Sequence, residues 1–229
     1  MTLGPNKLTL CLRNTLKKKE NKKIISRFLK GKYEWKNNEL KKLKDNIRLT
    51  LRKEQENRCI YCRRIIKIER KNVYEDIEHF LDKSKPYYRK WAFTNINLTI
   101  SCRACNFTKS TNDLGCIALR GSVNIKQHIG SFKWLHPYFD NYHDNIEILK
   151  GWVYRVKPNA PNPVASRNLI QECKLDDIKT IESRSEEAKN KIARLLHLAN
   201  RAGNAGNNAR AIKLSSAALA ELNKSWFDL

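Results

Sequence analysis

Acidic residues are scarce in this sequence of 229 residues, where 23 aspartates and glutamates stand against 46 lysines and arginines. The formal net charge of +23 at pH 7 is far beyond the modest charge that keeps a domain in solution. An excess of this size favours a polyanionic partner, because phosphates release counterions when lysine and arginine neutralise them. Nucleic acid is therefore the expected partner.

Long apolar runs are also missing. No stretch approaches the run of about 18 apolar residues that a membrane-spanning helix needs, and Met1–Leu10 lacks the apolar segment of a signal peptide. We therefore expect a cytoplasmic protein that does not contact a membrane. The seven cysteines, an odd number, are then not expected to form a disulfide framework. A hydrophobic content of 41% argues against a wholly disordered chain, and the length allows one or two domains.

The basic charge is unevenly distributed over three predicted segments. Residues 1–58 are basic and largely helical, with 18 basic and six acidic residues, net +12. Residues 59–150, the predicted core and its extension, carry net +6, and residues 151–229, a linker and a helical region, carry net +5. In the first segment, the run Leu16–Lys23 is either a flexible basic arm or a solvated face. In the third, Lys157–Ser166 contains three prolines, which is typical of a linker or an extended wrap.

Apolar periodicity predicts helices on both sides of the core. One amphipathic helix is expected to end near Asn57, and its apolar stripe consists of Leu40, Leu43, Ile47 and Leu51. After the linker we expect one or two helices over residues 178–199, a break at Gly203–Asn208, and a last helix over residues 211–222. From Cys59 to Asp113, short β-prone pieces alternate with loops. That segment has little apolar mass and needs an additional staple.

Four cysteines stand in two C-x-x-C pairs, Cys59–Cys62 and Cys102–Cys105, separated by 39 residues. Each pair lets two thiolates converge on one side of a tight turn, and two pairs complete the tetrahedral shell that a structural Zn²⁺ prefers. A redox role for one pair lacks the βαβ context that such pairs have, and it leaves the other pair unexplained. Because a closed shell has no open position, we expect this zinc to hold the fold and not to perform chemistry. The other cysteines are expected to be small buried or free thiols: Cys11, Cys116 and Cys173.

The segment between the cysteine pairs carries polar residues suited to catalysis. Glu78 and His79 stand side by side at the end of a β-prone piece, and Asn106 directly follows the last paired cysteine. A carboxylate and an amide oxygen are hard ligands suited to Mg²⁺ or Mn²⁺, and a neutral imidazole beside them can activate water. Together these groups provide the parts for phosphodiester hydrolysis.

Taken in order, C-x-x-C, Glu78-His79-Phe80, Asn97-Leu98 and C-x-x-C-N-x-x-K resemble the zinc-stapled HNH endonucleases, part of the His-Me finger nucleases. The resemblance covers about 50 residues, from Cys59 to Lys109. It implies an α+β protein with a β-hairpin and one helix, the ββα-metal core, which holds a single catalytic divalent ion. N- and C-terminal helices are expected to flank this core.

The resemblance also implies a role for each matching residue. His79 is expected to be the general base that deprotonates the attacking water, and Asn97 to support the loop that orients the imidazole. Glu78 and Asn106 are expected to bind the catalytic Mg²⁺ or Mn²⁺. They stand where the family more often has Asp and His, and both supply usable ligands. Lys109, one helical turn past Asn106, either contacts a substrate phosphate or is an ordinary solvated lysine.

Further along, Leu135-His136-Pro137-Tyr138-Phe139-Asp140 followed by Asp144-Asn145 is similar to a segment that accompanies the HNH core in PtuB-type proteins. These are the nuclease subunits of Septu-like and retron-associated antiphage systems. That family implies a PtuA-like ABC-type ATPase as partner, with the helical C-terminal third as its candidate docking surface. It also suggests a complex with a retron reverse transcriptase and its multicopy single-stranded DNA. We expect His136 and Tyr138 to be core residues of a packed turn and not catalytic ones.

The expected function is thus a metal-dependent HNH endonuclease, the toxic effector of an antiphage defence system. The alternative is a zinc-stabilised nucleic-acid-binding module without nuclease activity. The sequence leaves open whether the substrate is DNA or RNA, tRNA included. Five aromatic residues among basic ones are either base-stacking or core residues: Tyr33, Trp35, Tyr87, Tyr88 and Trp91.

Overall fold

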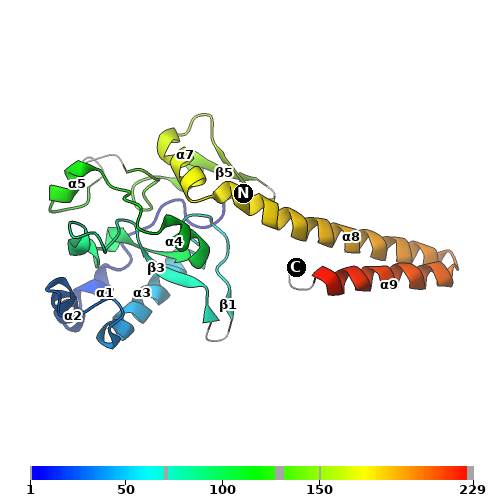
Figure 1. Cartoon of the computed structure of the whole chain (residues 1–229), viewed down its shortest axis with the longest axis horizontal. Coiled ribbons are helices and arrows are strands. Elements are labelled where there is room, and N and C mark those ends of the chain that lie inside the picture. Colours follow the sequence, from blue (N-terminus) through cyan, green and yellow to red (C-terminus); the bar gives the residue numbers. More distant parts are fainter. Residues whose placement is uncertain (1, 70–71, 127–131, 150, 226–229) are drawn as a thin grey trace. The chain divides into compact units, whose positions relative to one another are not determined.

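The computed structural model describes residues 2–69, 72–126, 132–149 and 151–225. The chain is α+β, with helices and small two-stranded sheets, as predicted. It divides into two compact units (Figure 1). The first comprises Met1–Glu147 and Tyr154–Leu175, and the second comprises Ile148–Val153 and Asp176–Leu229. Residues 1–58 therefore belong to the same unit as the predicted core.

The N-terminal part of the first unit is helical. Its elements are α1 (Arg13–Lys17), α2 (Lys19–Leu29), the short 3-10 helix η1 (Asn38–Leu40) and α3 (Lys41–Glu54). The predicted apolar stripe of α3 is confirmed, because Leu43, Ile47 and Leu51 are all buried. The basic run Leu16–Lys23 lies across α1 and α2 with its lysines exposed, so the structure favours a solvated helical face over a flexible arm.

Gln55, just after α3, fastens this helix to the sheet that follows. Its side-chain nitrogen donates to the Ile100 carbonyl over 2.8 Å, and its side-chain oxygen accepts from the Ile100 amide, also over 2.8 Å. Because Gln55 is buried, these two hydrogen bonds satisfy groups that water cannot reach. The end of α3 and the strand that contains Ile100 are thereby held together.

In the described part of the chain, three short two-stranded sheets follow one another. The pairs are β1 (Ile68–Glu69) with β2 (Asn72–Val73), β3 (Glu75–His79) with β4 (Leu98–Cys102), and β5 (Ile146–Leu149) with β6 (Val153–Val156). The second pair is antiparallel, with Glu75 opposite Cys102 and His79 opposite Leu98. Helix α4 (Arg103–Lys109) begins directly after β4. The connection from β3 to β4 contains the 3-10 helices η2 (Arg89–Trp91) and η3 (Asn95–Asn97).

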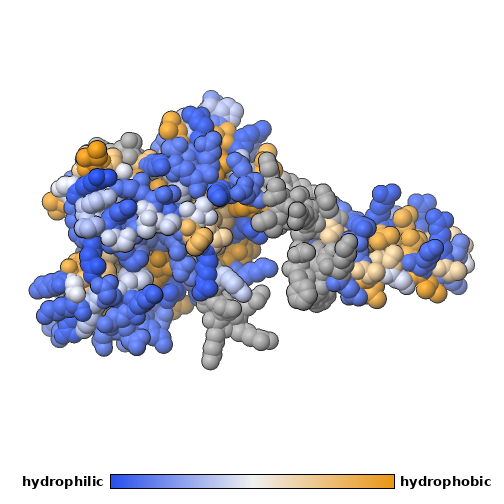
Figure 2. Space-filling model, in the orientation of Figure 1, coloured by the Kyte–Doolittle hydropathy of each residue, from blue (hydrophilic) through white to orange (hydrophobic). Residues whose placement is uncertain are grey.

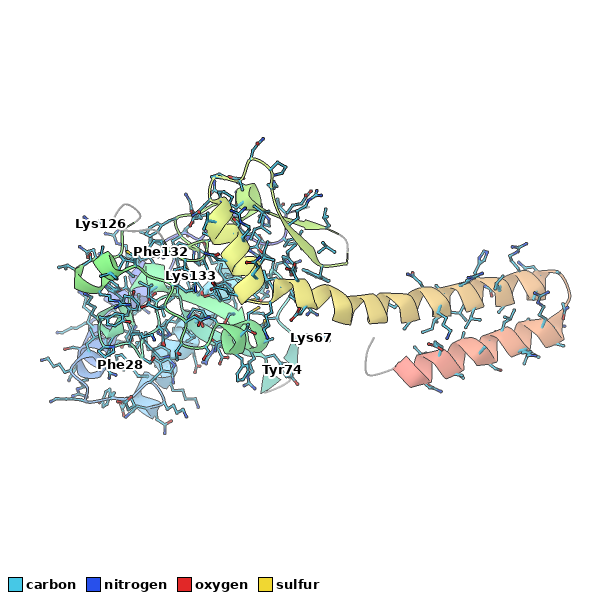
Figure 3. The ribbon with its side chains drawn as sticks, turned by 45° about the horizontal axis from the view of Figure 1, so that its top comes forward. Phe28, Lys67, Tyr74, Lys126, Phe132 and Lys133 are labelled. Atoms are coloured by element: carbon cyan, nitrogen blue, oxygen red, sulfur yellow. The ribbon has the colours of Figure 1, made fainter. Side chains whose placement is uncertain are left out.

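Aromatic side chains pack much of the first unit. Phe28 of α2, labelled in Figure 3, packs edge-on against Phe93 at 5.3 Å between ring centroids. Tyr88 and Trp91 are buried, so the core interpretation holds for both. His136 and Tyr138 are buried as well, which confirms the predicted packed turn.

The rest of the first unit contains α5 (Ile117–Gly121), α6 (Tyr142–Asn145) and α7 (Pro163–Glu172), and the 3-10 helix η5 (Leu175–Asp177) begins at its last residue. Helix α7 corrects the predicted linker Lys157–Ser166, because residues 163–166 are helical. Asn162 caps this helix by accepting from the Ala165 amide, and Pro163 stands in its first turn, where a proline is favourable. The last of the three prolines, Pro163, thus belongs to the start of a helix and not to a linker.

The larger part of the second unit is a hairpin of two helices, α8 (Ile178–Asn204) and α9 (Asn208–Ser225), which run side by side in Figure 1. The predicted break at Gly203–Asn208 is confirmed in position, with Gly206 at φ +76° in the turn. Hydrophilic and hydrophobic residues are interspersed on the coloured part of the hairpin surface in Figure 2. None of the described helices combines the length and the apolar character needed to cross a bilayer.

Candidate active site and cysteine cluster

The four paired cysteines meet at one place. The sulfur atoms of Cys59, Cys62, Cys102 and Cys105 all lie within 4.8 Å of one another, and those of Cys62 and Cys102 are 4.0 Å apart. Four sulfurs at about 2.3 Å from a tetrahedral zinc lie roughly 3.8 Å from each other. The cluster therefore has the composition and nearly the size of a four-thiolate metal site, so these cysteines can hold a metal ion.

The first cysteine pair is shaped by a tight turn. The Arg63 amide donates to the Cys59 carbonyl over 3.0 Å, and the Ile60 amide donates to the Ile100 carbonyl over 3.1 Å. Arg63 adopts φ +61°, a left-handed conformation that favours glycine, and its buried guanidinium lies 4.0 Å from the centre of the Tyr142 ring. The turn thus directs both thiols towards the end of β4.

The second pair connects the cluster to the polar site. Cys102 is the last residue of β4 and Cys105 lies in α4, directly before Asn106. Holding Cys105 in the cluster therefore fixes where Asn106 points. The sequence prediction that the cysteines serve the fold is consistent with this position, since the cluster ties the Cys59–Cys62 turn, β4 and α4 together.

A hollow of about 430 Å³ lies over β3 and α4. The structure brings Glu78, His79, Asn106 and Lys109 of the predicted site to this one hollow. Asn97 does not line it and is fully buried behind it. The lining also includes residues that were not singled out as site residues in the sequence, among them Arg48, Asp76, Lys83 and Phe107.

Lys109 is the residue whose surroundings differ most from expectation. Only 2% of Lys109 is exposed, so its interpretation as a solvated lysine is wrong. Its Nζ lies 2.6 Å from Glu78 Oε1 and donates to the His79 carbonyl over 3.0 Å. Tyr61 also donates to Glu78 Oε1, over 3.3 Å. Burial raises the pKa of Glu78 above its ordinary value, and the Lys109 ammonium offsets only part of this effect.

His79 ends β3 and is buried beneath Trp35, whose ring meets the imidazole edge-on at 4.6 Å between centroids. The imidazole Nε2 lies 3.1 Å from the Ala92 carbonyl, which can only accept a hydrogen bond. A proton on Nε2 therefore satisfies this contact and makes Nδ1 a hydrogen-bond acceptor. Burial, followed by the charges of Lys83 and Lys109, holds the pKa of His79 well below its ordinary value. The imidazole is consequently neutral at pH 7.

Asn97 holds the loop that carries Ala92. Its Oδ1 accepts from the Leu81 amide over 2.7 Å, and its Nδ2 donates to the carbonyls of Leu81 and Trp91 over 3.0 and 3.2 Å. Trp91 directly precedes Ala92, the hydrogen-bond partner of His79. The side chain thus joins both ends of the loop that orients the imidazole.

Asp76 is a site residue that sequence reasoning missed. Its Oδ2 accepts from Asn106 Nδ2 over 3.1 Å, and both residues line the hollow. The signal was present in the sequence, because residues two apart in a strand share one face, and Asp76 is two residues before Glu78. Asp76 adds a second carboxylate and leaves Asn106 Oδ1 out of this hydrogen bond. Oxygen ligands of this type suit a hard divalent cation.

Comparisons with known proteins add no assignment. A scan against models of protein families gave no match, and neither the curated proteins nor the solved structures contained a match to this chain. Any functional assignment therefore rests on the residues of the chain itself and on the geometry described above.

Proposed function

We propose that this chain is a divalent-metal-dependent endonuclease of the HNH type, in which β3, β4 and α4 are the ββα-metal core. One observation carries the proposal: the neighbours Glu78 and His79 of β3 and the distant Asn106 of α4 line one hollow next to a cluster of four cysteines. That the metal held by the four cysteines is zinc is also part of the proposal. The net charge of +23 supports a nucleic-acid substrate.

In the proposed mechanism His79 is the general base. With Nε2 bonded to the Ala92 carbonyl, Nδ1 accepts the proton of the attacking water, and the low pKa keeps it unprotonated at neutral pH. Asp76, Glu78 and Asn106 are the residues that hold Mg²⁺ or Mn²⁺. The bound cation supplies stabilisation of the charge that develops on the phosphate and on the leaving 3′-oxygen. Asn97 is a positioning residue, because it acts through the loop.

The experiment is a cleavage assay with the full-length protein and Mg²⁺ or Mn²⁺. Plasmid, single-stranded DNA and total RNA are offered in parallel to the wild type and to His79→Ala. His197→Ala is the matched control, since His197 is an exposed histidine of α8. We expect cleavage by the wild type and by His197→Ala and none by His79→Ala. If every substrate survives the wild type in the presence of its activated partner, the enzyme proposal fails.

The second candidate function is a nucleic-acid-binding module without nuclease activity. The contact of Lys109 with Glu78 favours it, because an ammonium 2.6 Å from Oε1 competes with a metal ion for that carboxylate. Isothermal titration of the zinc-loaded protein with Mn²⁺ separates the two candidates. Binding that is lost in Asp76→Asn and Asn106→Ala supports the enzyme. Absence of Mn²⁺ binding, together with tight binding of nucleic acid, supports the module.

We further propose that the nuclease is the toxic effector of a Septu-like or retron-associated antiphage system, as a PtuB-type subunit. Its partners are then a PtuA-like ABC-type ATPase and, in the retron systems, a reverse transcriptase with its single-stranded DNA. The genes next to this one provide the cheapest test, followed by co-purification with the encoded ATPase. A chain that is fully active and non-toxic by itself contradicts the effector role.

A further inference from the structure

The chemistry proposed above assigns no task to Phe107. This residue follows Asn106 in α4 and lines the same hollow as His79. Phe107 is 87% exposed, the highest value among the large apolar residues that the structure describes. An aromatic ring at the mouth of a polar site is therefore available to a ligand.

Helix α4 holds this ring in a defined place. Cys105 and Lys109 are buried on the inner side of the helix, where the cysteine cluster and the contact with Glu78 secure them. Phe107 lies between them in sequence and is exposed, as expected for the outer side of a helix. The ring thus stands on an element fixed at both ends and not on a loop.

The other side chains of the hollow define what kind of ligand suits it. Arg48 and Lys83 line the hollow, and Lys83 Nζ lies 5.0 Å from the centre of the Trp35 ring. Cations of this kind suit phosphate groups. The ring of Phe107, by contrast, offers a flat apolar face without hydrogen-bond donors or acceptors. The fitting ligand therefore combines a phosphate with a flat ring whose face is free.

We propose that Phe107 is a stacking platform for an unpaired nucleobase, so that the site takes single-stranded or locally unpaired nucleic acid. This inference rests on the proposed nuclease function and names its substrate class. In an intact duplex both faces of each base are covered by its neighbours, so Phe107 gains a stacking partner only from a base that has left the stack.

Binding tests the inference without catalysis. In the His79→Ala background, fluorescence anisotropy with Mg²⁺ measures binding of labelled 12-nucleotide DNA and RNA strands. Phe107→Ala is expected to weaken binding roughly ten- to hundredfold, and Phe107→Trp to restore it. Ile117→Ala is the matched control, because Ile117 is 80% exposed in α5 and lies outside the hollow.

Abasic strands identify the contact itself. Single nucleotides of the strand are replaced one at a time by abasic residues. At one position, the parent protein and its Phe107→Ala variant are expected to bind the abasic strand with equal affinity. If no position does so, or if Phe107→Ala binds every intact strand within about threefold of its parent, the inference is wrong.

Cleavage separates this inference from the function it rests on. In the enzyme that retains His79, Phe107→Ala is expected to raise the KM for single strands. The KM for a fully paired duplex of the same sequence is expected to stay unchanged. An equal loss on both substrates overturns the inference and leaves the nuclease intact. If the wild type cleaves nothing, the proposed function fails, and the abasic series still decides whether Phe107 stacks.

Discussion

Lys109 Nζ lies 2.6 Å from Glu78 Oε1, and both side chains are almost completely buried. The same ammonium donates to the backbone carbonyl of His79, so one lysine of α4 contacts two consecutive residues of β3. A buried charge of this kind is tolerable only with its partner present. Lys109 is thus part of the framework that holds α4 against β3.

Removing Lys109 is expected to lower the free energy of unfolding considerably. Lys109→Met leaves the Glu78 carboxylate buried without a cation, which costs about 3–5 kcal/mol. Urea denaturation followed by tryptophan fluorescence measures the loss. The double variant Lys109→Met with Glu78→Gln removes both charges and is expected to lose less. Lys191→Met is the control, because the side chain of Lys191 is 60% exposed and its ion pair with Glu221 contributes about 1 kcal/mol or less. The prediction is contradicted if Lys109→Met and Lys191→Met lower the free energy of unfolding by similar amounts.

One zinc per chain is expected by elemental analysis. Cys102→Ser opens the four-thiolate shell and is expected to unfold the first unit, since the cluster joins the Cys59–Cys62 turn, β4 and α4. Cys11→Ser is the matched control, because Cys11 lies outside the cluster and is half-buried. Circular dichroism and thermal denaturation report the outcome. A wild-type protein that is folded and free of zinc is the result that rules this prediction out.

Asn97→Ala is expected to destabilise the first unit by about 2–4 kcal/mol, because three hydrogen bonds of a fully buried amide are lost. The neighbouring Asn95 provides the control. The buried amide of Asn95 has no hydrogen-bond partner among the described residues, so Asn95→Ala is expected to change stability little. Chemical denaturation compares the two variants. Equal losses mean that the loop does not depend on the Asn97 amide.

Stability is expected to fall in acid because of His136. Burial lowers the pKa of His136 from 6.5 to about 3, so the folded protein keeps the imidazole neutral while the unfolded chain takes up a proton. Between pH 6.5 and about 3, this costs roughly 1.4 kcal/mol per pH unit. His136→Asn keeps an acceptor near the position of Nδ1, which accepts from the Tyr138 amide.

Urea denaturation of the wild type and of His136→Asn at pH 7, 6 and 5 isolates this contribution from those of other groups. The variant starts from a lower stability, and the difference between the two proteins is expected to shrink as the pH falls. A difference that stays constant from pH 7 to 5 contradicts the assigned cause.

Much of the local structure was predictable because it depends on neighbours in sequence. The stripe of Leu43, Ile47 and Leu51 predicted α3, and the break at Gly203–Asn208 predicted the end of one helix and the start of the next. The linker was predicted less well. Helix α7 starts at Asn162 and Pro163, and the Asn162 side chain caps it through a contact with the Ala165 amide. The three prolines of Lys157–Ser166 do not reveal that contact.

The sequence by itself determined the spacing of the two C-x-x-C pairs, the positive charge and most of the residues with catalytic potential, since each depends on residue type and spacing alone. Only the tertiary structure decided how those residues are used. It paired Lys109 with Glu78 across two elements, joined Asp76 to Asn106, and left Phe107 exposed beside them. These relationships arise where α4 packs on β3, between residues about 30 positions apart, and short-range patterns carry no information about contacts of that range.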